Sequence, residues 1–283
     1  MKFNNSPIGI FDSGLGGLTV FKEIRKMLPC EDLIYFGDTA RVPYGNKSKE
    51  TIIRYSSEIF KFLTDKGVKI IVVACNTASS LALDDLRKNA SVPVFGVIEP
   101  GAKKAVRASH GKNIAVIGTS ATIKSRAYSI AIHKEIESLN GRAGGKPNSA
   151  GSFRIVEKAC PLFVPLVEEG LLNEEITKNA INYYLSSVIA EKPSCLVLGC
   201  THYPMLKDLI LDAAGGNIEI IDSGVETARA VRDYLKENGM LKASGPSGGE
   251  LFFVSDDMEK FKELGEKFLD RAIKNVSLAE IAK

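Results

Sequence analysis

The sequence predicts an α/β protein built from parallel sheets flanked by helices. Short apolar runs, rich in β-branched residues, alternate along the chain with longer segments whose apolar residues recur at helical spacing. Alternation of this kind produces parallel strands joined by right-handed crossovers. A second observation points to two halves, because two of the apolar runs end in the same manner. In both, a cysteine is followed by polar side chains, at Cys75 and at Cys200.

The first elements follow this order closely. Residues 7–11 are the first expected strand, and a Gly-rich turn leads from it into a helix that ends at Pro29. That helix carries its apolar residues on one face, at Phe21, Ile24 and Leu28. A strand at 33–36 comes next, followed by a second amphipathic helix that closes at Gly67. Its apolar face is formed by Ile52, Tyr55, Ile59 and Phe62.

The rest of the chain continues the alternation. Short apolar runs predict further strands at 70–73, 94–97, 114–117, 196–198 and 218–221. Phe252 and Phe253 indicate a buried strand, and a last amphipathic helix over residues 256–268 is expected to be scaffold. The Gly/Ser/Pro-rich stretch at 141–151 lacks apolar periodicity and predicts an exposed loop.

A short internal repeat supports two related halves. Residues 8–13 resemble residues 114–119, and each of these segments is followed downstream by a strand that ends in one of the two cysteines. The interval between the repeat and the cysteine is longer in the second half, where the expected loop at 141–151 accounts for the difference.

Composition and charge argue against several classes of protein. The 283 residues are 45% apolar and 25% charged, which is typical of a globular protein of one or two domains. A net charge of +3, with lysines dispersed among acidic residues, is too small to indicate nucleic-acid binding. Because no apolar stretch is long enough for a membrane span and no signal segment begins the sequence, we expect a cytoplasmic protein without a membrane partner.

Five cysteines occur, at positions 30, 75, 160, 195 and 200. Their odd number and the lack of short paired spacing predict neither a disulfide framework nor a zinc ribbon. Cys195 and Cys200 stand at opposite ends of one apolar strand, so a metal or redox pair there would need the strand to fold back. We therefore expect reduced thiols and no metal site, with Cys30 and Cys160 in structural roles.

Cys75 and Cys200 are the candidates for chemistry. A thiol at the carboxyl end of a buried strand lies where parallel α/β sheets place their active sites. The helix that follows offers unpaired N–H groups and the positive end of a dipole, both of which favour a thiolate. Two such thiols could remove a proton from one face of a carbon centre and return a proton to the other face, which inverts that centre.

The Gly-rich segment at 12–19 could instead be a phosphate cradle, because backbone amides at a helix start can bind an anion. It matches neither common fingerprint. The sequence after Gly17 is Leu18 rather than the Lys-Ser/Thr of a P-loop, and Thr19 stands where the third glycine of the dinucleotide pattern belongs. Amides at such a turn can equally hold a carboxylate, and Asp12 is placed to act on a neighbouring acid or base.

Six short motifs follow one another along nearly the whole chain. They are Ile-Phe-Asp-Ser-Gly-Leu-Gly-Gly at 10–17, Pro-Tyr-Gly at 43–45, Ala-Cys-Asn-Thr-Ala at 74–78, Gly-Thr-x-x-Thr at 118–122, Cys-Pro-x-x-Val-Pro-Leu-Val-Glu at 160–168 and Gly-Cys-Thr-His-Tyr-Pro at 199–204. Together these motifs resemble those of the bacterial glutamate racemases. The resemblance implies two pseudo-symmetric α/β domains, residues 1–98 with 209–283 and residues 99–208, with the substrate in the cleft between them.

The resemblance also implies an activity. It is the cofactor-independent interconversion of L- and D-glutamate, which supplies D-glutamate for peptidoglycan and thereby for the cell wall and cell shape. No pyridoxal or other cofactor is expected, glutamate is the expected partner, and a homodimer is expected by resemblance alone. A related racemase acting on aspartate or another amino acid, and a non-catalytic nucleotide-binding module, remain the alternatives.

Residue roles follow from the motif positions. Cys75 and Cys200 correspond to the two bases, and Asp12, His202 and Glu168 correspond to residues that assist them. The positions that contact the substrate in the family correspond here to Asp12, Ser13, Tyr44, Gly45, Asn76, Thr77, Thr119, Thr122, Thr201 and His202. Most of these are neutral donors, which hold carboxylates without the strong ground-state pairing that arginine or lysine would give. Taken alone, any Ser or Thr among them could equally be a plain helix cap.

Overall fold

A computed structural model describes residues 4–142, 153–243 and 245–281. The chain divides into two compact units, and each is described by itself. Unit 1 comprises Met1–Val97 and Gly224–Lys283, and unit 2 comprises Ile98–Ser223. Within the described ranges, none of the helices combines the length and apolar character that crossing a membrane requires.

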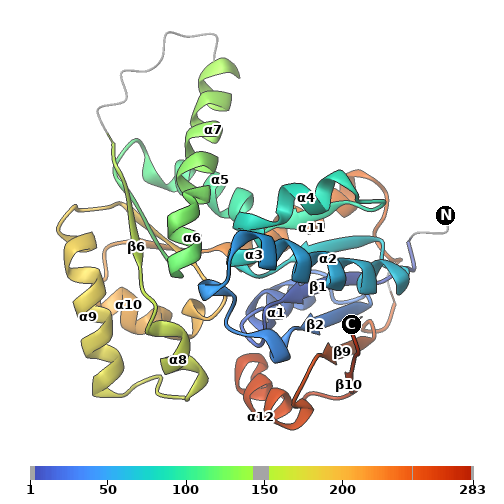
Figure 1. Ribbon diagram of the computed structural model, residues 1–283. Coiled ribbons are helices and arrows are strands. Elements are labelled where there is room, and N and C mark those ends of the chain that lie inside the picture. The colour runs from blue at the N-terminus through green and yellow to red at the C-terminus, as the bar shows by residue number, and fades with distance from the viewer. Residues whose placement is uncertain (1–3, 143–152, 244, 282–283) are drawn as a thin grey trace. The chain divides into compact units, whose positions relative to one another are not determined.

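Unit 1 is built on a six-stranded sheet in which each neighbouring pair of strands is parallel (Figure 1). The strand order is β10-β9-β2-β1-β3-β4. The strands are β1 (Ile8–Asp12), β2 (Leu33–Gly37), β3 (Ile70–Val73), β4 (Val94–Gly96), β9 (Glu250–Val254) and β10 (Val276–Leu278). β1, β2 and β3 are completely buried, as continuous apolar runs in a parallel sheet should be.

Helices cover both faces of this sheet, because successive side chains of a strand point to opposite faces. Tyr35 of β2 packs with Phe21 of α1 (Leu18–Met27) and Phe261 of α12 (Met258–Leu269). The next residue, Phe36, packs with Phe62 of α2 (Lys49–Asp65) on the other face. The remaining helices of this part are α3 (Asn76–Leu81), α4 (Leu83–Lys88), α11 (Ser223–Glu237) and the 3-10 turns η1 (Thr39–Arg41) and η2 (Tyr44–Asn46).

Unit 2 repeats the central part of this topology. Its parallel sheet has the order β6-β5-β7-β8, which matches β2-β1-β3-β4 strand for strand. The strands are β5 (Ile114–Gly118), β6 (Ile155–Ala159), β7 (Cys195–Gly199) and β8 (Glu219–Asp222). The helices are α5 (Ile98–Ser109), α6 (Ser120–Ser125), α7 (Ala127–Arg142), α8 (Phe163–Glu168), α9 (Glu175–Ile189), α10 (Lys207–Ala213) and η3 (Tyr203–Leu206). The predicted fold class of two related α/β halves is confirmed.

Three details differ from the expectations. β8 pairs with β7, and residues 209–223, expected in the first domain, group with unit 2. Gly141 and Arg142 belong to α7 rather than to the expected loop, and the rest of that loop, residues 143–151, lies outside the described residues. The chain also forms β6 and β10, two edge strands that the apolar runs did not predict.

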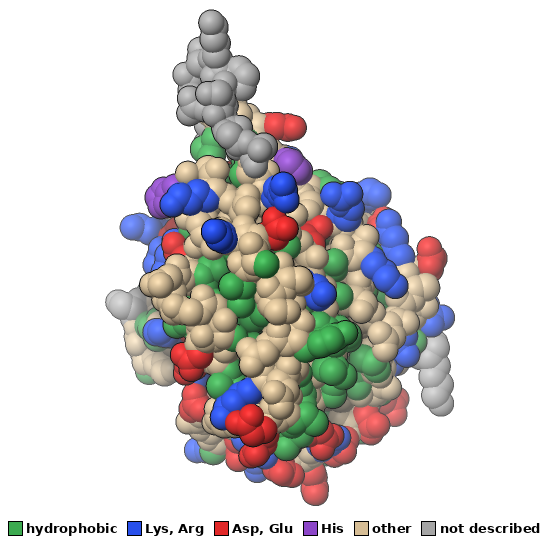
Figure 2. Space-filling view, turned by 90° about the vertical axis from the view of Figure 1, so that its left-hand side faces the viewer, with side chains coloured by type: hydrophobic (Ala, Val, Ile, Leu, Met, Phe, Trp, Pro, Cys, Tyr) green, Lys and Arg blue, Asp and Glu red, His purple; other side chains and the backbone are tan. Residues whose placement is uncertain are grey.

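Apolar side chains reach the surface of unit 2 at a few positions. More than half of the residue surface is exposed at Leu162, which directly precedes α8, and at Ile176 and Tyr183, which lie on α9. Figure 2 shows the side of the molecule on which Figure 1 draws α9, where hydrophobic side chains lie between charged ones.

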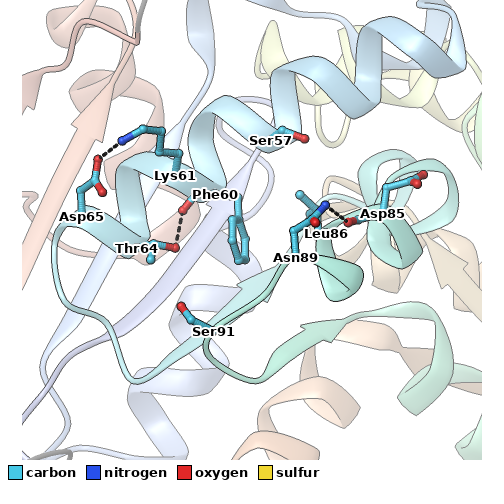
Figure 3. Close-up of a pocket in the computed structure, with 9 residues that line it drawn as sticks. All are labelled: Ser57, Phe60, Lys61, Thr64, Asp65, Asp85, Leu86, Asn89 and Ser91. Carbon is cyan, nitrogen blue, oxygen red and sulfur yellow. Dashed lines mark hydrogen bonds and ion pairs between the residues drawn. The ribbon is translucent and has the colours of Figure 1, made fainter.

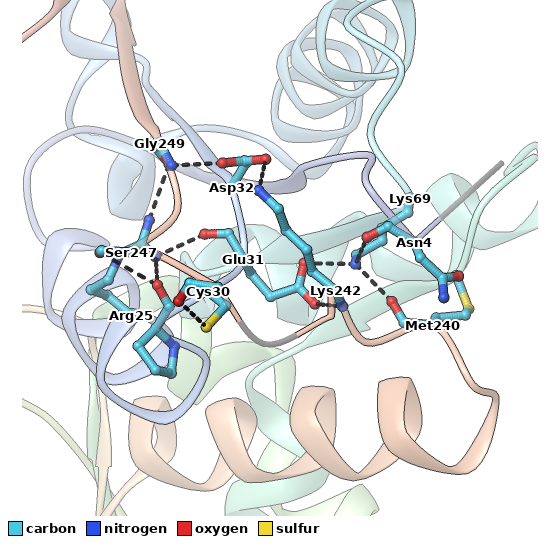
Figure 4. Close-up of polar contacts among 12 residues, drawn as sticks. Asn4, Arg25, Cys30, Glu31, Asp32, Lys69, Met240, Lys242, Ser247 and Gly249 are labelled. Carbon is cyan, nitrogen blue, oxygen red and sulfur yellow. Dashed lines mark hydrogen bonds and ion pairs between the residues drawn. The ribbon is translucent and has the colours of Figure 1, made fainter. Parts of the chain in front are cut away.

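A buried ion pair joins segments at the amino edge of the unit 1 sheet (Figure 4). Lys69 Nζ lies 2.6 Å from Glu31 Oε2, and the two side chains are 0% and 2% exposed. The same ammonium donates to the carbonyls of Asn4 (3.0 Å) and Met240 (2.7 Å), and Glu31 Oε1 accepts from the backbone N–H of Lys242 at 2.8 Å. The pair therefore fixes the segment after α11 and the start of the chain onto the entrances to β2 and β3.

We expect Lys69→Met to lower the free energy of unfolding by about 3–5 kcal/mol, because it leaves the Glu31 carboxylate buried without its partner. Urea denaturation of the full chain measures the change. Lys61→Met is the matched control. Lys61 Nζ also lies 2.6 Å from a carboxylate oxygen, that of Asp65, but the two side chains are 76% and 63% exposed. Equal losses in the two variants would contradict a stabilising role for the buried pair.

Candidate active site

The first group of predicted site residues lies where the strands of unit 1 end. Phe11 of β1 is paired with Val73 of β3, so Ser13 and Cys75 follow at the same edge of the sheet. The Cys75 thiol donates to Ser13 Oγ across 3.6 Å. Asn76 and Thr77 begin α3 directly after the cysteine, and both are buried. We call this group, with Asp12, the Cys75 site.

Cys75 also serves as the N-cap of α3. Its sulfur accepts a hydrogen bond from the backbone N–H of Ala78 at 3.5 Å. N–H groups at a helix start stabilise a negative charge on such a sulfur. The thiol is 5% exposed, so the surrounding protein rather than bulk water determines which protonation state it adopts.

The Gly-rich turn after β1 is shaped by close packing around Asp12. The Asp12 carboxylate is fully buried and accepts from the backbone N–H of Gly14 at 2.9 Å. A Cβ added at Gly17 would lie only 2.4 Å from Asp12 Cβ, so this position requires glycine. The packing of the turn therefore accounts for this glycine without any bound phosphate.

The predicted Tyr44–Gly45 turn is held by an aspartate that the motifs did not single out. The hydroxyl of Tyr44 donates to Asp38, a fully buried carboxylate that also accepts from Arg41 Nε (2.7 Å) and Ser255 Oγ (2.8 Å). Burial, together with Asp38, raises the pKa of Tyr44, which keeps its hydroxyl a neutral donor. A sequence signal for Asp38 existed, because it follows Gly37 at the end of β2 much as Asp12 ends β1.

The second group lies in the equivalent place in unit 2, where Gly118 of β5 is paired with Gly199 of β7. Cys200 follows β7 directly, and its sulfur lies 3.9 Å from Nδ1 of His202. The other ring nitrogen of His202, Nε2, lies 2.9 Å from Oε1 of Glu168 at the end of α8. Thiol, imidazole and carboxylate thus form a continuous chain, which we call the Cys200 site.

The charge state of His202 follows from these partners. Burial alone lowers the pKa of a histidine, but the bonds to Cys200 and Glu168 outweigh it and raise the pKa of His202 to about 10. The ring therefore carries a proton at neutral pH. An imidazolium beside Cys200 can stabilise a thiolate or exchange a proton with it.

The predicted threonines of unit 2 are buried or capping residues. Thr119 is the N-cap of α6, where its hydroxyl accepts from the N–H of Thr122 at 3.2 Å and lies 3.0 Å from the Thr122 hydroxyl. Thr201 is buried next to Cys200. Thr119 therefore has the helix-capping role that was the alternative for these residues. The cap holds its hydroxyl next to the turn after β5.

Two further cysteines, Cys160 and Cys195, are buried. Burial raises the pKa of Cys160 to about 12 and that of Cys195 to about 11, so both stay protonated thiols. None of the five cysteines, all of which lie in the described ranges, forms a disulfide bond. In the described part of the chain, no three His, Cys, Asp or Glu side chains form a group that could hold a metal ion.

One surface hollow in unit 1 is unrelated to the Cys75 site (Figure 3). It has a volume of about 260 Å³, and among its lining residues are Phe60, Lys61 and Asp65 of α2 with Leu86 and Asn89 near α4. These segments lead into the amino ends of β3 and β4, whereas Cys75 follows the carboxyl end of β3. Its lining includes no cysteine or histidine, so we assign it no chemistry.

Comparison with known proteins gives one consistent result. The family model described as Asp/Glu/Hydantoin racemase matches residues 8–231. A glutamate racemase of Geobacter metallireducens is 48% identical over 262 residues, which cover 93% of this chain and 92% of that protein. A glutamate racemase of Aquifex aeolicus is 50% identical over 260 residues, covering 91% and 92%. The crystal structure of the Francisella tularensis glutamate racemase with D-glutamate superposes with a TM-score of 0.87 at 36% identity, covering 98% of both chains.

The raised pKa of His202 predicts a pH dependence of stability. The folded ring holds its proton up to about pH 10, whereas an unfolded histidine releases it near pH 6.5. Stability from this proton is therefore complete below about pH 6.5 and is lost as the pH rises towards 10. We expect the difference in unfolding free energy between the wild type and His202→Asn to shrink over this range, as measured by urea denaturation.

The control for this measurement is His110→Asn. His110 is exposed and has a positive φ of 49°, a conformation that asparagine tolerates. Its pH profile should follow that of the wild type. A wild-type advantage over His202→Asn that does not shrink between about pH 6.5 and 10 would show that the buried ring is neutral over this range.

Proposed function

Since this chain belongs to the aspartate, glutamate and hydantoin racemase family, and its relatives at 48–50% identity are glutamate racemases, we propose that Cys75 and Cys200 interconvert L- and D-glutamate. The chain is a glutamate racemase, an isomerase acting on an amino acid. One observation carries the two-thiol mechanism. Each thiol lies within two residues of the end of a strand, β3 or β7, and these strands hold the same place in the matching orders β2-β1-β3-β4 and β6-β5-β7-β8.

In the proposed reaction, one sulfur begins as a thiolate and the other as a thiol. The thiolate takes the α-proton of glutamate and becomes a thiol, and the electron pair stays on the α-carbon and its carboxylate. The opposite thiol then gives its proton to the other face of the carbon and becomes a thiolate. The balance needs no external oxidant, reductant or cofactor, and the enzyme is left ready for the reverse turnover.

The residues beside each thiol support this exchange of protons. At Cys200, the protonated His202 lies 3.9 Å from the sulfur and is held by Glu168. At Cys75, Asp12 is the proposed proton partner, and the Ala78 N–H stabilises the thiolate. A positioned acid or base of this kind contributes about 10²–10⁴-fold to a rate.

Proton transfer alone is not sufficient, because an α-carbanion beside a carboxylate is very unstable. Oriented donors must stabilise the charge that develops in the transition state. We assign this role to the neutral groups that adjoin the thiols, namely Ser13, Tyr44, Gly45, Asn76, Thr77, Thr119, Thr122 and Thr201. Asp38 supports this set indirectly, because it holds the Tyr44 side chain.

The two alternatives differ in their support. Aspartate is a shorter dicarboxylic amino acid that the same thiols could racemise, so the substrate must be tested directly. A nucleotide-binding module would require the Gly-rich turn to hold phosphate, whereas packing against Asp12 already explains Gly17. The homodimer, the supply of D-glutamate for peptidoglycan and the cytoplasmic location stay predictions.

The decisive experiment follows the circular dichroism of L-glutamate incubated with the purified protein and no added cofactor. We expect the signal to decay to zero and stop there, because the two enantiomers have equal free energy. Cys75→Ser and Cys200→Ser should each slow the decay by at least about 10³-fold, since a serine hydroxyl is a far weaker base than a thiolate.

Cys30→Ser is the matched control, because this partly exposed cysteine lies outside both sites, and it should racemise glutamate at the wild-type rate. Decay of the aspartate signal but not the glutamate signal would replace the proposed substrate. Full activity in either site variant would contradict the two-thiol mechanism.

A further inference from the structure

Two buried tyrosine hydroxyls bond to backbone carbonyls in the turns that adjoin the proposed catalytic residues. Tyr35 Oη donates to the carbonyl of Gly14 at 2.7 Å in unit 1. Tyr203 Oη donates to the carbonyl of Cys160 at 2.8 Å in unit 2. Both tyrosine side chains are fully buried, and burial raises the pKa of both well above the usual value, so each hydroxyl keeps its proton and remains a donor.

The Tyr35 hydroxyl fixes the turn that carries Asp12 and Ser13. Its ring is held from three sides by Phe21, Phe252 and Phe261, with centroid separations of 5.9–6.2 Å. Glycines leave room for the hydroxyl, since a Cβ at Gly17 would lie 2.9 Å from Tyr35 Oη. The turn therefore rests against a rigid aromatic cluster, and Ser13 is presented to the Cys75 thiol from it.

The Tyr203 hydroxyl performs the equivalent task in unit 2. Tyr203 directly follows His202, and its ring packs against Phe163 at 5.1 Å between centroids. The carbonyl that it reaches, at Cys160, also accepts from the N–H of Phe163, the first residue of α8. Because α8 ends at Glu168, this bond ties the turn with Cys200 and His202 to the helix that supplies the histidine's partner.

We infer that Tyr35 and Tyr203 are positioning residues, one for each thiol, whose hydroxyls hold the turns on which proton transfer at Cys75 and Cys200 depends. This inference rests on the proposed function for its catalytic consequence. The positioning of each turn by its tyrosine can be tested without any activity, because each hydroxyl bonds to the turn of its own site. The two tyrosines do not occupy equivalent places in the repeat: Tyr35 lies within a strand, whereas Tyr203 lies in the segment after one.

Tyr35→Phe and Tyr203→Phe test the inference, since each removes one oxygen and keeps the packed ring. Loss of the bond removes the side-chain donor from a buried carbonyl and lets the turn shift, which should lower kcat for both enantiomers by about tenfold or more. KM should stay within about twofold, because neither hydroxyl reaches the proposed binding groups directly.

A second readout does not need racemase activity. The rate at which iodoacetamide alkylates each cysteine, followed by peptide mass spectrometry, should change severalfold at Cys75 in Tyr35→Phe only. The rate at Cys200 should change in Tyr203→Phe only. Tyr183→Phe, whose ring is 75% exposed in the same unit as Tyr203, should leave both rates and kcat unchanged.

The outcomes separate the possible failures. Wild-type labelling of both thiols in both folded variants would overturn the inference, and so would equal changes at both thiols in each variant. Site-selective labelling by a wild-type protein that racemises no amino acid would uphold the positioning role and overturn the proposed function. Circular dichroism in the far ultraviolet confirms folding, and if one variant does not fold, the other tests the inference through its own thiol.

Discussion

Parallel backbone pairing is the constraint on which both candidate sites depend. In each unit a central strand, β1 or β5, pairs on both sides with strands that run in the same direction, so that their carboxyl ends reach one edge of the sheet. Register then determines which side chains meet. A slip of one residue would turn each strand over and remove the thiol from the neighbouring hydroxyl residue. The different packing partners on the two faces, such as Phe21 for Tyr35 and Phe62 for Phe36, oppose such a slip.

Much of this arrangement could be predicted from the sequence. The predictions that were missing or wrong have physical reasons. The central strands are buried on both faces, so they appear as continuous β-branched runs, and the two cysteines stand visibly at their ends. β6 has the sequence Ile-Val-Glu-Lys-Ala and is only half buried, as befits an edge strand, so its signal is weak. The place of β8 depends on its pairing with β7, a contact between distant segments that no local pattern encodes.

The same distinction applies to the supporting residues. Asp38 could have been found, because an aspartate at a strand end is a local signal. Tyr35, inside an apolar run, and Tyr203, in the segment after one, could not, because only the folded chain shows which carbonyl each hydroxyl reaches. Gly17 could be predicted only in part. Its presence was evident, but its cause, contact with Asp12 and Tyr35, required the structure.

The two units share a topology but surround their thiols with different chemistry, and this difference suits the proposed reaction. A racemase of this kind needs one thiolate and one thiol at the start of each turnover. At Cys200 a protonated histidine, stabilised by Glu168, places a positive charge beside the sulfur. At Cys75 the Ala78 N–H and the Ser13 hydroxyl are neutral, and the proposed proton partner is the carboxyl of Asp12. Identical surroundings would favour the same protonation state at both sulfurs, whereas a cation at one and a carboxyl at the other let them differ.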